Sequence, residues 1–169
     1  MPSTYTLISS NVLASSAASV TFSAIPSTYT DLVVRWSGRG DGAASYYITF
    51  NGTGGTSYSH TRITGSGSAA SSGQASNAAF IQYVASLEDS SYTANTFDSN
   101  EIYVAGYATS NNKPTGGGGT MENNATSSFM NATAGLFRSA SAITSLTIAA
   151  QSGNLVSGSS FYLYGIKNS

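Results

Sequence analysis

The chain has 169 residues, a length typical of one domain, and only 8% of them are charged, against roughly 25% in an average soluble domain. Six Lys and Arg against seven Asp and Glu give a net charge of −1, which excludes a broad basic surface for nucleic acid. Hydrophobic residues make up 40% of the chain, which excludes disorder driven by net charge. No apolar run approaches the ~20 residues that span a bilayer.

Cysteine is absent, so thiolate nucleophiles and cysteine-based zinc sites are excluded. A chain of this length can bury a sizeable core without disulfides. Residues Met1 to Ser10 lack the charged and apolar regions of a secretory signal, and we therefore expect synthesis in the cytoplasm.

Strands are predicted along the whole chain. Helix formers are scarce, and apolar residues either alternate with polar ones or form short β-branched and aromatic runs. In the final segment, for example, Phe161 and Leu163 oppose Tyr162 and Tyr164. The expected strands are Tyr5–Ser9, Ser19–Ser23, Leu32–Gly38, Ser45–Asn51, Tyr58–Ile63, Ala78–Val84, Glu101–Tyr107, Ser127–Asn131, Ser145–Ala149 and Ser160–Ile166, with Ala134–Phe137 as a further candidate.

Turn residues separate these strands. The pair Asn51-Gly52 is a hairpin signal, because a type I′ turn needs positive φ at both central residues, although the spacing to Thr56 suggests a longer loop. Two segments are low in complexity: Gly65 to Ser76, and Asn111 to Thr120 with its four consecutive glycines. Both are predicted to be long surface loops.

Short strands at regular spacing predict an all-β fold, namely a single-domain antiparallel β-sandwich of jelly-roll type over residues 1–169. The alternative is an immunoglobulin-like sandwich. That fold's cysteine pair is missing, although Trp36 lies in an apolar strand where it would fill the core.

Candidate catalytic residues are few. The single histidine, His60, is expected to point outward between Ser59 and Thr61 on a strand. Adjacent residues of an extended chain face opposite ways, so Glu88 and Asp89 make no natural glycosidase pair. The remaining acids considered for that role are Asp98, Glu101 and Glu122. We expect no enzyme activity, no metal site and no cofactor.

Candidate interaction residues lie in loops and near the N-terminus. Tyr92 and Phe97 occur in a polar stretch, where they either contact a protein or sugar or fold back to cap the sandwich. Arg39-Gly40-Asp41 spells an integrin-recognised tripeptide, and it is also ordinary turn chemistry with a local ion pair between Arg39 and Asp41. Tyr5 belongs to the segment Met1–Leu13, a candidate contact element and intersubunit arm.

Several segments resemble, in order along nearly the whole chain, a family of small virion proteins of tailed bacteriophages, common in phages of cyanobacteria and other aquatic hosts. The resemblance rests on strand-and-turn segments and therefore carries over no catalytic residue. The segments that resemble this family are Thr4-Tyr5-Thr6-Leu7-Ile8, the run from Phe22 to Leu32, Ile48-Thr49-Phe50-Asn51-Gly52, Glu122-Asn123-Asn124-Ala125, Ala134-Gly135-Leu136 and Leu163-Tyr164-Gly165-Ile166-Lys167-Asn168.

The resemblance implies a non-enzymatic virion component, either a capsid decoration (cement) protein or a module of a fibre or tail. We expect a decoration protein on the capsid surface that forms a homotrimer and bridges neighbouring subunits of the major capsid protein. The alternative is a tail-fibre module that binds a receptor or a host-surface glycan. Neither nucleic acid nor a membrane is an expected partner.

Overall fold

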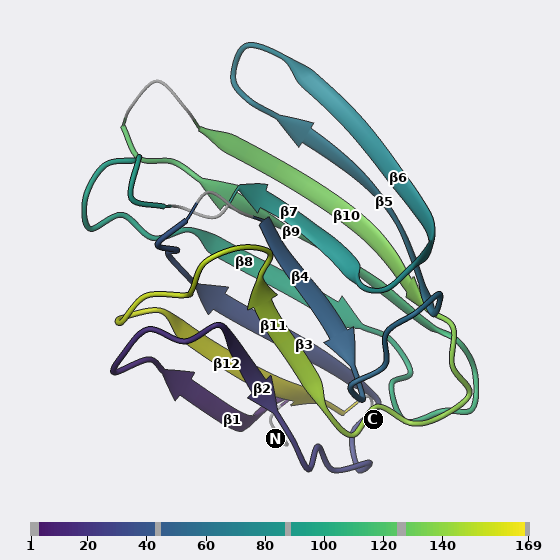
Figure 1. Cartoon of the computed structure of the whole chain (residues 1–169). Helices are drawn as coiled ribbons and strands as arrows, with labels where there is room; N and C mark the ends of the chain where they lie inside the picture. Colours follow the sequence, from purple (N-terminus) through teal and green to yellow (C-terminus); the bar gives the residue numbers. More distant parts are fainter. Residues whose placement is uncertain (1–3, 43–44, 87–88, 125–127, 168–169) are drawn as a thin grey trace.

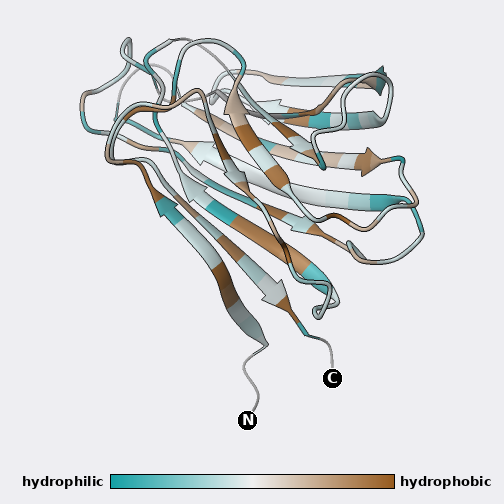
Figure 2. Ribbon diagram, turned by 60° about the horizontal axis from the view of Figure 1, so that its bottom comes forward, coloured by the Kyte–Doolittle hydropathy of each residue, from teal (hydrophilic) through white to brown (hydrophobic). Residues whose placement is uncertain are grey.

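The computed structural model describes residues 4–42, 45–86, 89–124 and 128–167, and every regular element in them is a β-strand. Most strands alternate polar and apolar side chains, as Figure 2 shows along the ribbon, and β6 and β9 are the exceptions. Their bounds are β1 Tyr5–Val12, β2 Ser19–Phe22, β3 Asp31–Ser37, β4 Ser45–Phe50, β5 Tyr58–Gly65, β6 Ala70–Ala78, β7 Ile81–Ser86, β8 Ser99–Val104, β9 Lys113–Met121, β10 Phe129–Phe137, β11 Leu146–Ala150 and β12 Ser160–Ile166.

Two antiparallel sheets of unequal size lie face to face (Figure 1). The large sheet has eight strands in the order β1-β12-β3-β8-β9-β10-β5-β6, and the small sheet has four in the order β2-β11-β4-β7. The small sheet covers one face of the large sheet, and its edge strand β7 contacts β5, β9 and β10. The predicted all-β sandwich is confirmed.

The core fills the space between the sheets. From the small sheet, Phe22, Ile48 and Leu146 are buried, and they face buried residues of the large sheet such as Val34 and Leu163. Aromatic rings join the layers: Trp36 of the large sheet meets Tyr46 of the small sheet edge-on, and Phe137 of the large sheet meets Phe50 of the small sheet, each at 5.4 Å between ring centroids. Trp36 fills the core as predicted.

The prediction of a loop over Asn111 to Thr120 was wrong. The four consecutive glycines Gly116–Gly119 lie inside β9, a central strand of the large sheet. Glycine has a low intrinsic preference for strands, but β8 and β10 form backbone ladders with β9 along both of its sides. The neighbouring strands therefore supply the order that the glycines lack.

The second predicted loop, Gly65 to Ser76, was also wrong. Most of it forms β6, the edge strand that pairs with β5. Elsewhere the predicted and observed strands agree closely, with two differences. The segments predicted at Ser127–Asn131 and Ala134–Phe137 fall in the single strand β10 from Phe129 on, while Ser127 lies outside the described residues. The strand predicted from Ala78 begins at Ile81 because Ala78 ends β6.

The turn at Asn51-Gly52 has the predicted conformation but not the predicted hairpin. Both residues have positive φ, 53° and 62°, and the amide of Thr53 donates to the carbonyl of Phe50 at 2.9 Å. However, β4 and β5 belong to different sheets, so the turn starts a crossing between the two layers. The Asn51 carboxamide also accepts from the amide of Thr144 at 2.8 Å and so fixes the segment before β11.

Candidate site on the outer face of the large sheet

The face of the large sheet that points away from the small sheet is the candidate site. Strand alternation sends Trp36 into the core while Arg35 points outward. The same alternation on β12 buries Phe161 and Leu163 and leaves Tyr162 and Tyr164 on the outer side. We refer to this surface as the outer face.

Cross-strand pairing arranges the outer side chains in rows. One row runs Tyr162, Arg35, Glu101, Gly118 and Ala132 across β12, β3, β8, β9 and β10. The next row runs Tyr164, Val33, Tyr103, Gly116 and Ala134 across the same strands. The bulky residues therefore come from β12, β3 and β8, and β9 and β10 contribute residues with almost no side chain.

An ion pair lies in the middle of the first row. The Arg35 Nε donates to Glu101 Oε2 at 2.6 Å, with both side chains about half exposed, 53% and 48%. This hydrogen bond is the main cause that raises the pKa of Arg35. The guanidinium also lies 5.5 Å from the ring centroid of Tyr5 and 6.0 Å from that of Tyr164. The pair is electrically neutral as a whole, so it adds no net charge to the outer face.

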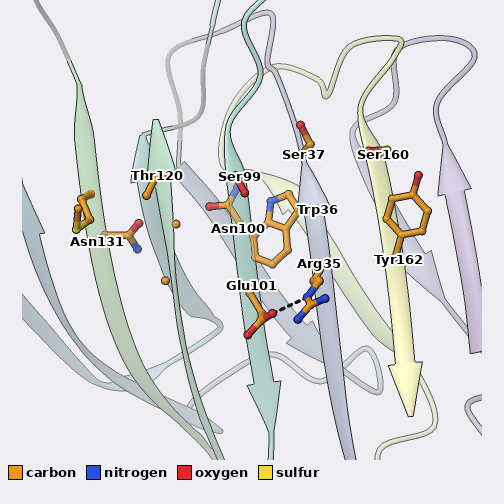
Figure 3. Close-up of a pocket in the computed structure, with 13 residues that line it drawn as sticks. Arg35, Trp36, Ser37, Ser99, Asn100, Glu101, Thr120, Asn131, Ser160 and Tyr162 are labelled. Atoms are coloured by element: carbon orange, nitrogen blue, oxygen red, sulfur yellow. Dashed lines mark hydrogen bonds and ion pairs between the residues drawn. The ribbon is translucent and has the colours of Figure 1, made fainter. Parts of the chain in front are cut away.

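A hollow of about 650 Å³ opens on the outer face beside this pair (Figure 3). Tyr162 borders it on one side and Met130 on the other, and the bare backbone of Gly118 lies between them. Four hydroxyl-bearing residues line one end of the hollow, where Ser160 pairs with Ser37 and Ser99 pairs with Thr120. Trp36, Asn100, Gly119 and Asn131 also line it.

Arg39, a predicted contact residue, has a structural role. Its Nη1 donates to the carbonyls of Thr93 and Thr96, both at 2.9 Å, and its Nη2 donates to the carbonyl of Asp89 at 2.7 Å. These bonds fasten the loop between β7 and β8 to the end of β3. The same guanidinium also reaches the Tyr92 carbonyl at 3.3 Å.

Asp41 pairs with Asn154, whose amide and side-chain nitrogen donate to its two carboxylate oxygens at 2.7 and 3.0 Å. These bonds lower the pKa of Asp41. The Arg39 guanidinium and the Asp41 carboxylate are thus directed to separate segments of the chain, and the structure explains the Arg39-Gly40-Asp41 segment as a junction between loops.

The two loop aromatics are half-buried. Tyr92 lies in the stretch that Arg39 fastens, and its amide donates to the carbonyl of Asp89 at 3.1 Å. Phe97 lies close to Gly158, where an added Cβ would be 3.3 Å from the Phe97 ring. The loop therefore folds back onto the sandwich, and a further contact of Tyr92 or Phe97 with a protein or sugar stays a prediction.

Tyr5 is the predicted contact residue that lies beside the outer face. It is 45% exposed on β1, and its ring meets Tyr164 edge-on at 6.3 Å between centroids. The segment predicted as an arm contains β1, which pairs with β12 of its own chain from Tyr5 to Val12. Whether it also contacts another subunit stays a prediction.

His60 was predicted to point outward, and this was wrong. It is 5% exposed on the inner side of β5, because it pairs with Gly135 and shares the inner side with Tyr58. Burial, and then the charge of Arg62, lower its pKa, so the imidazole is neutral near pH 7.

The acids considered for catalysis are not gathered. Asp98 is buried and accepts from Tyr46 Oη at 2.6 Å, Glu101 pairs with Arg35, and Glu122 is exposed. Asp89 is buried and caps Ser91 in its own loop, and Glu88 lies outside the described residues. Within the described residues, no group of three or more potential metal-ligating His, Asp or Glu side chains occurs.

The described residues form no helix with the length and apolar character that a membrane crossing requires. The chain matches no protein-family model, and no curated protein is significantly similar to it.

Proposed function

We propose that the chain is a non-enzymatic structural protein of a tailed-phage particle, namely a decoration protein that binds the outside of the capsid. The phage assignment rests on the strand-and-turn segments that resemble small virion proteins. The observation that supports an assembled protein is the state of the large sheet's two edge strands, β1 and β6.

Both edges are long, and although each edge pair has one register irregularity, neither strand has the protection of a charge or a proline. β1 has eight residues and β6 has nine, and neither contains a proline or a charged residue. Soluble monomers ordinarily block such edges with charges, prolines or very short strands, because unpaired N–H and C=O groups recruit other strands. β1 also exposes Tyr5, Leu7 and Val12, the last by 59%. These features favour a surface that is covered when copies assemble.

The proposed mechanism is avidity. Each copy would associate with its own kind around a rotation axis, most simply as a trimer, and contact several neighbouring capsid subunits. The low charge of the chain allows dense packing of copies. Weak individual contacts would then add up to a clamp across subunit boundaries.

We also infer that the fold is an extended jelly roll. Four strands of the large sheet, β1-β12-β3-β8, face the four strands of the small sheet, β2-β11-β4-β7. The chain passes between the two sets in the order of two Greek keys, which is the order of a jelly roll. The pairs β5-β6 and β9-β10 extend only the large sheet, and they create the half of the outer face that carries Gly118, Met130 and Ile63.

Imaging of intact particles, together with a count of copies per particle, tests the proposed function. A decoration protein should occupy symmetry-related positions on the shell in hundreds of copies. A few dozen copies or fewer, or density only at the tail, would overturn it and favour a fibre module.

A further inference from the structure

The hollow on the outer face combines three kinds of group. The ring of Tyr162 lies beside Arg35 and is seen with its face toward the viewer in Figure 3. The Nη atoms of Arg35 make no hydrogen bond to the described part of the chain, because its bond to Glu101 uses Nε. The hydroxyls of Ser37, Ser99, Thr120 and Ser160 make none to the described residues either. Aromatic surface and unused polar groups therefore border one open space.

The composition of the lining favours one class of ligand. Arg35 and Glu101 neutralise each other at 2.6 Å, so the hollow offers no net charge to a polyanion or a polycation. A wholly apolar ligand would leave the hydroxyls and the guanidinium unpaired. The volume, about 650 Å³, lies in the range of small-molecule sites.

We propose that this hollow binds a neutral oligosaccharide. One face of a hexopyranose ring is rich in C–H groups and would stack on Tyr162, and its hydroxyls would accept from Arg35 Nη and exchange hydrogen bonds with the row of Ser and Thr hydroxyls. The absence of a side chain at Gly118 lets the next sugar unit lie against the backbone of β9. This activity would be additional to capsid binding and independent of it.

Titration of the purified full chain with three neutral trisaccharides, chitotriose, cellotriose and maltotriose, tests the site. The readouts are backbone NMR shifts and the fluorescence of Trp36, the single tryptophan, which is buried under the hollow. At least one trisaccharide should bind and shift resonances of β3, β8 and β12. Tyr162→Ala should weaken that binding about tenfold, the scale of one lost aromatic contact.

Matched variants distinguish binding in the hollow from nonspecific binding to the protein surface. Arg35→Lys keeps the charge but loses the planar donor fork, so it should weaken binding several-fold. Ile63→Ala removes a 60% exposed apolar side chain from the same face outside the hollow and should leave binding unchanged. The proposal is overturned if no neutral trisaccharide binds, if trigalacturonate binds more tightly than all three, or if Tyr162→Ala changes the oligomeric state but not the binding.

Discussion

At the scale of single residues, one guanidinium organises the loop between β7 and β8. Arg39 donates to backbone carbonyls at three or more places in that loop, and such bonds are strong because the donor is charged. Nothing in the sequence around Arg39 signals this role, since its partners are carbonyls that every residue has. The loop that contains both aromatics is held by a residue that precedes Tyr92 by 53 positions.

Removing the guanidinium should release this loop. We expect Arg39→Ala to lower the free energy of unfolding by about 2–3 kcal/mol, because several charge-assisted bonds are lost. Amide hydrogen exchange over residues 89–98 should rise, and Arg39→Lys should give an intermediate result. Unchanged protection of that loop in Arg39→Ala would contradict the assigned role.

Tyr103, on the outer face, makes the stability of the folded state depend on pH. Its hydroxyl donates to the buried Asp31 carboxylate at 2.5 Å, and this bond, with burial, raises the pKa of Tyr103 to about 12. Because the unfolded chain loses this proton near pH 10, the folded state binds more protons between pH 10 and about 12. The contribution to stability is therefore complete below pH 10 and falls as the pH rises through this window.

Denaturant titrations across that alkaline window check this expectation. Burial also raises the pKa of Tyr58 and Tyr107, so the wild-type chain should lose stability there in any case. Tyr103→Phe should make the loss shallower, and absorbance titration should show one fewer late-ionising tyrosine. An identical alkaline slope in both proteins would disprove the assignment.

The outer face shows which parts of the candidate site the sequence pattern can predict. The alternation of Tyr162 and Tyr164 with Phe161 and Leu163 is visible in the sequence and correctly separates the two faces of β12. The sequence does not reveal which strands lie beside β12. Arg35 and Glu101 are 66 positions apart, and the pairing of β3 with β8 brings them together.

At the scale of elements, β9 shows that position in a sheet can override intrinsic preference. Its glycines are not equivalent. A Cβ on Gly118 would lie 2.4 Å from the backbone oxygen of Asn131, and one on Gly119 would lie 1.8 Å from Asn100 Oδ1. A Cβ on Gly116 meets nothing within 4 Å. Close approach therefore requires glycine at 118 and 119 but not at 116.

Two alanine substitutions in β9 should have opposite effects. Gly116→Ala should raise stability by about 0.5–1 kcal/mol, because alanine loses less backbone entropy in a strand. Gly118→Ala should lower stability by about 1–3 kcal/mol, because a backbone oxygen must move. Thermal or denaturant unfolding of both variants measures the difference, and equal effects would refute the distinction.

The sequence predicted most strands because alternation is strong where one face is buried. It failed at β6, which consists mainly of Ser and Ala, and at β9, which contains four consecutive glycines. β6 and β9 form because their backbones pair with β5 and β10, respectively. This pairing depends on the fold as a whole and cannot be read from a short stretch of sequence.

At the scale of the whole molecule, the unequal sheets leave one broad open face and two edge strands without charges or prolines. The edge strand β1 also carries exposed apolar side chains, which an association of copies through this edge would cover. If copies associate through this edge, its chemistry should control the oligomeric state.

A charge on β1 should disrupt that association. Leu7 is 52% exposed on the edge and Ile63 is 60% exposed on the outer face, so Leu7→Lys and Ile63→Lys are matched changes. We expect Leu7→Lys to shift the protein toward monomer in sedimentation experiments and Ile63→Lys to leave its oligomeric state unchanged. The reverse result would place the contact on the outer face.

The pairing of β1 with β12 also has a mechanical consequence. These neighbours are antiparallel, with Tyr5 opposite Ile166, so the first and last strands bring both ends of the described chain to one end of the sandwich (Figure 2). A force applied between the two ends would break the backbone hydrogen bonds between β1 and β12 one after another. Strands loaded in shear must instead break many bonds at once. Tension through the termini would therefore peel β1 away at low force and leave the rest of the sandwich folded.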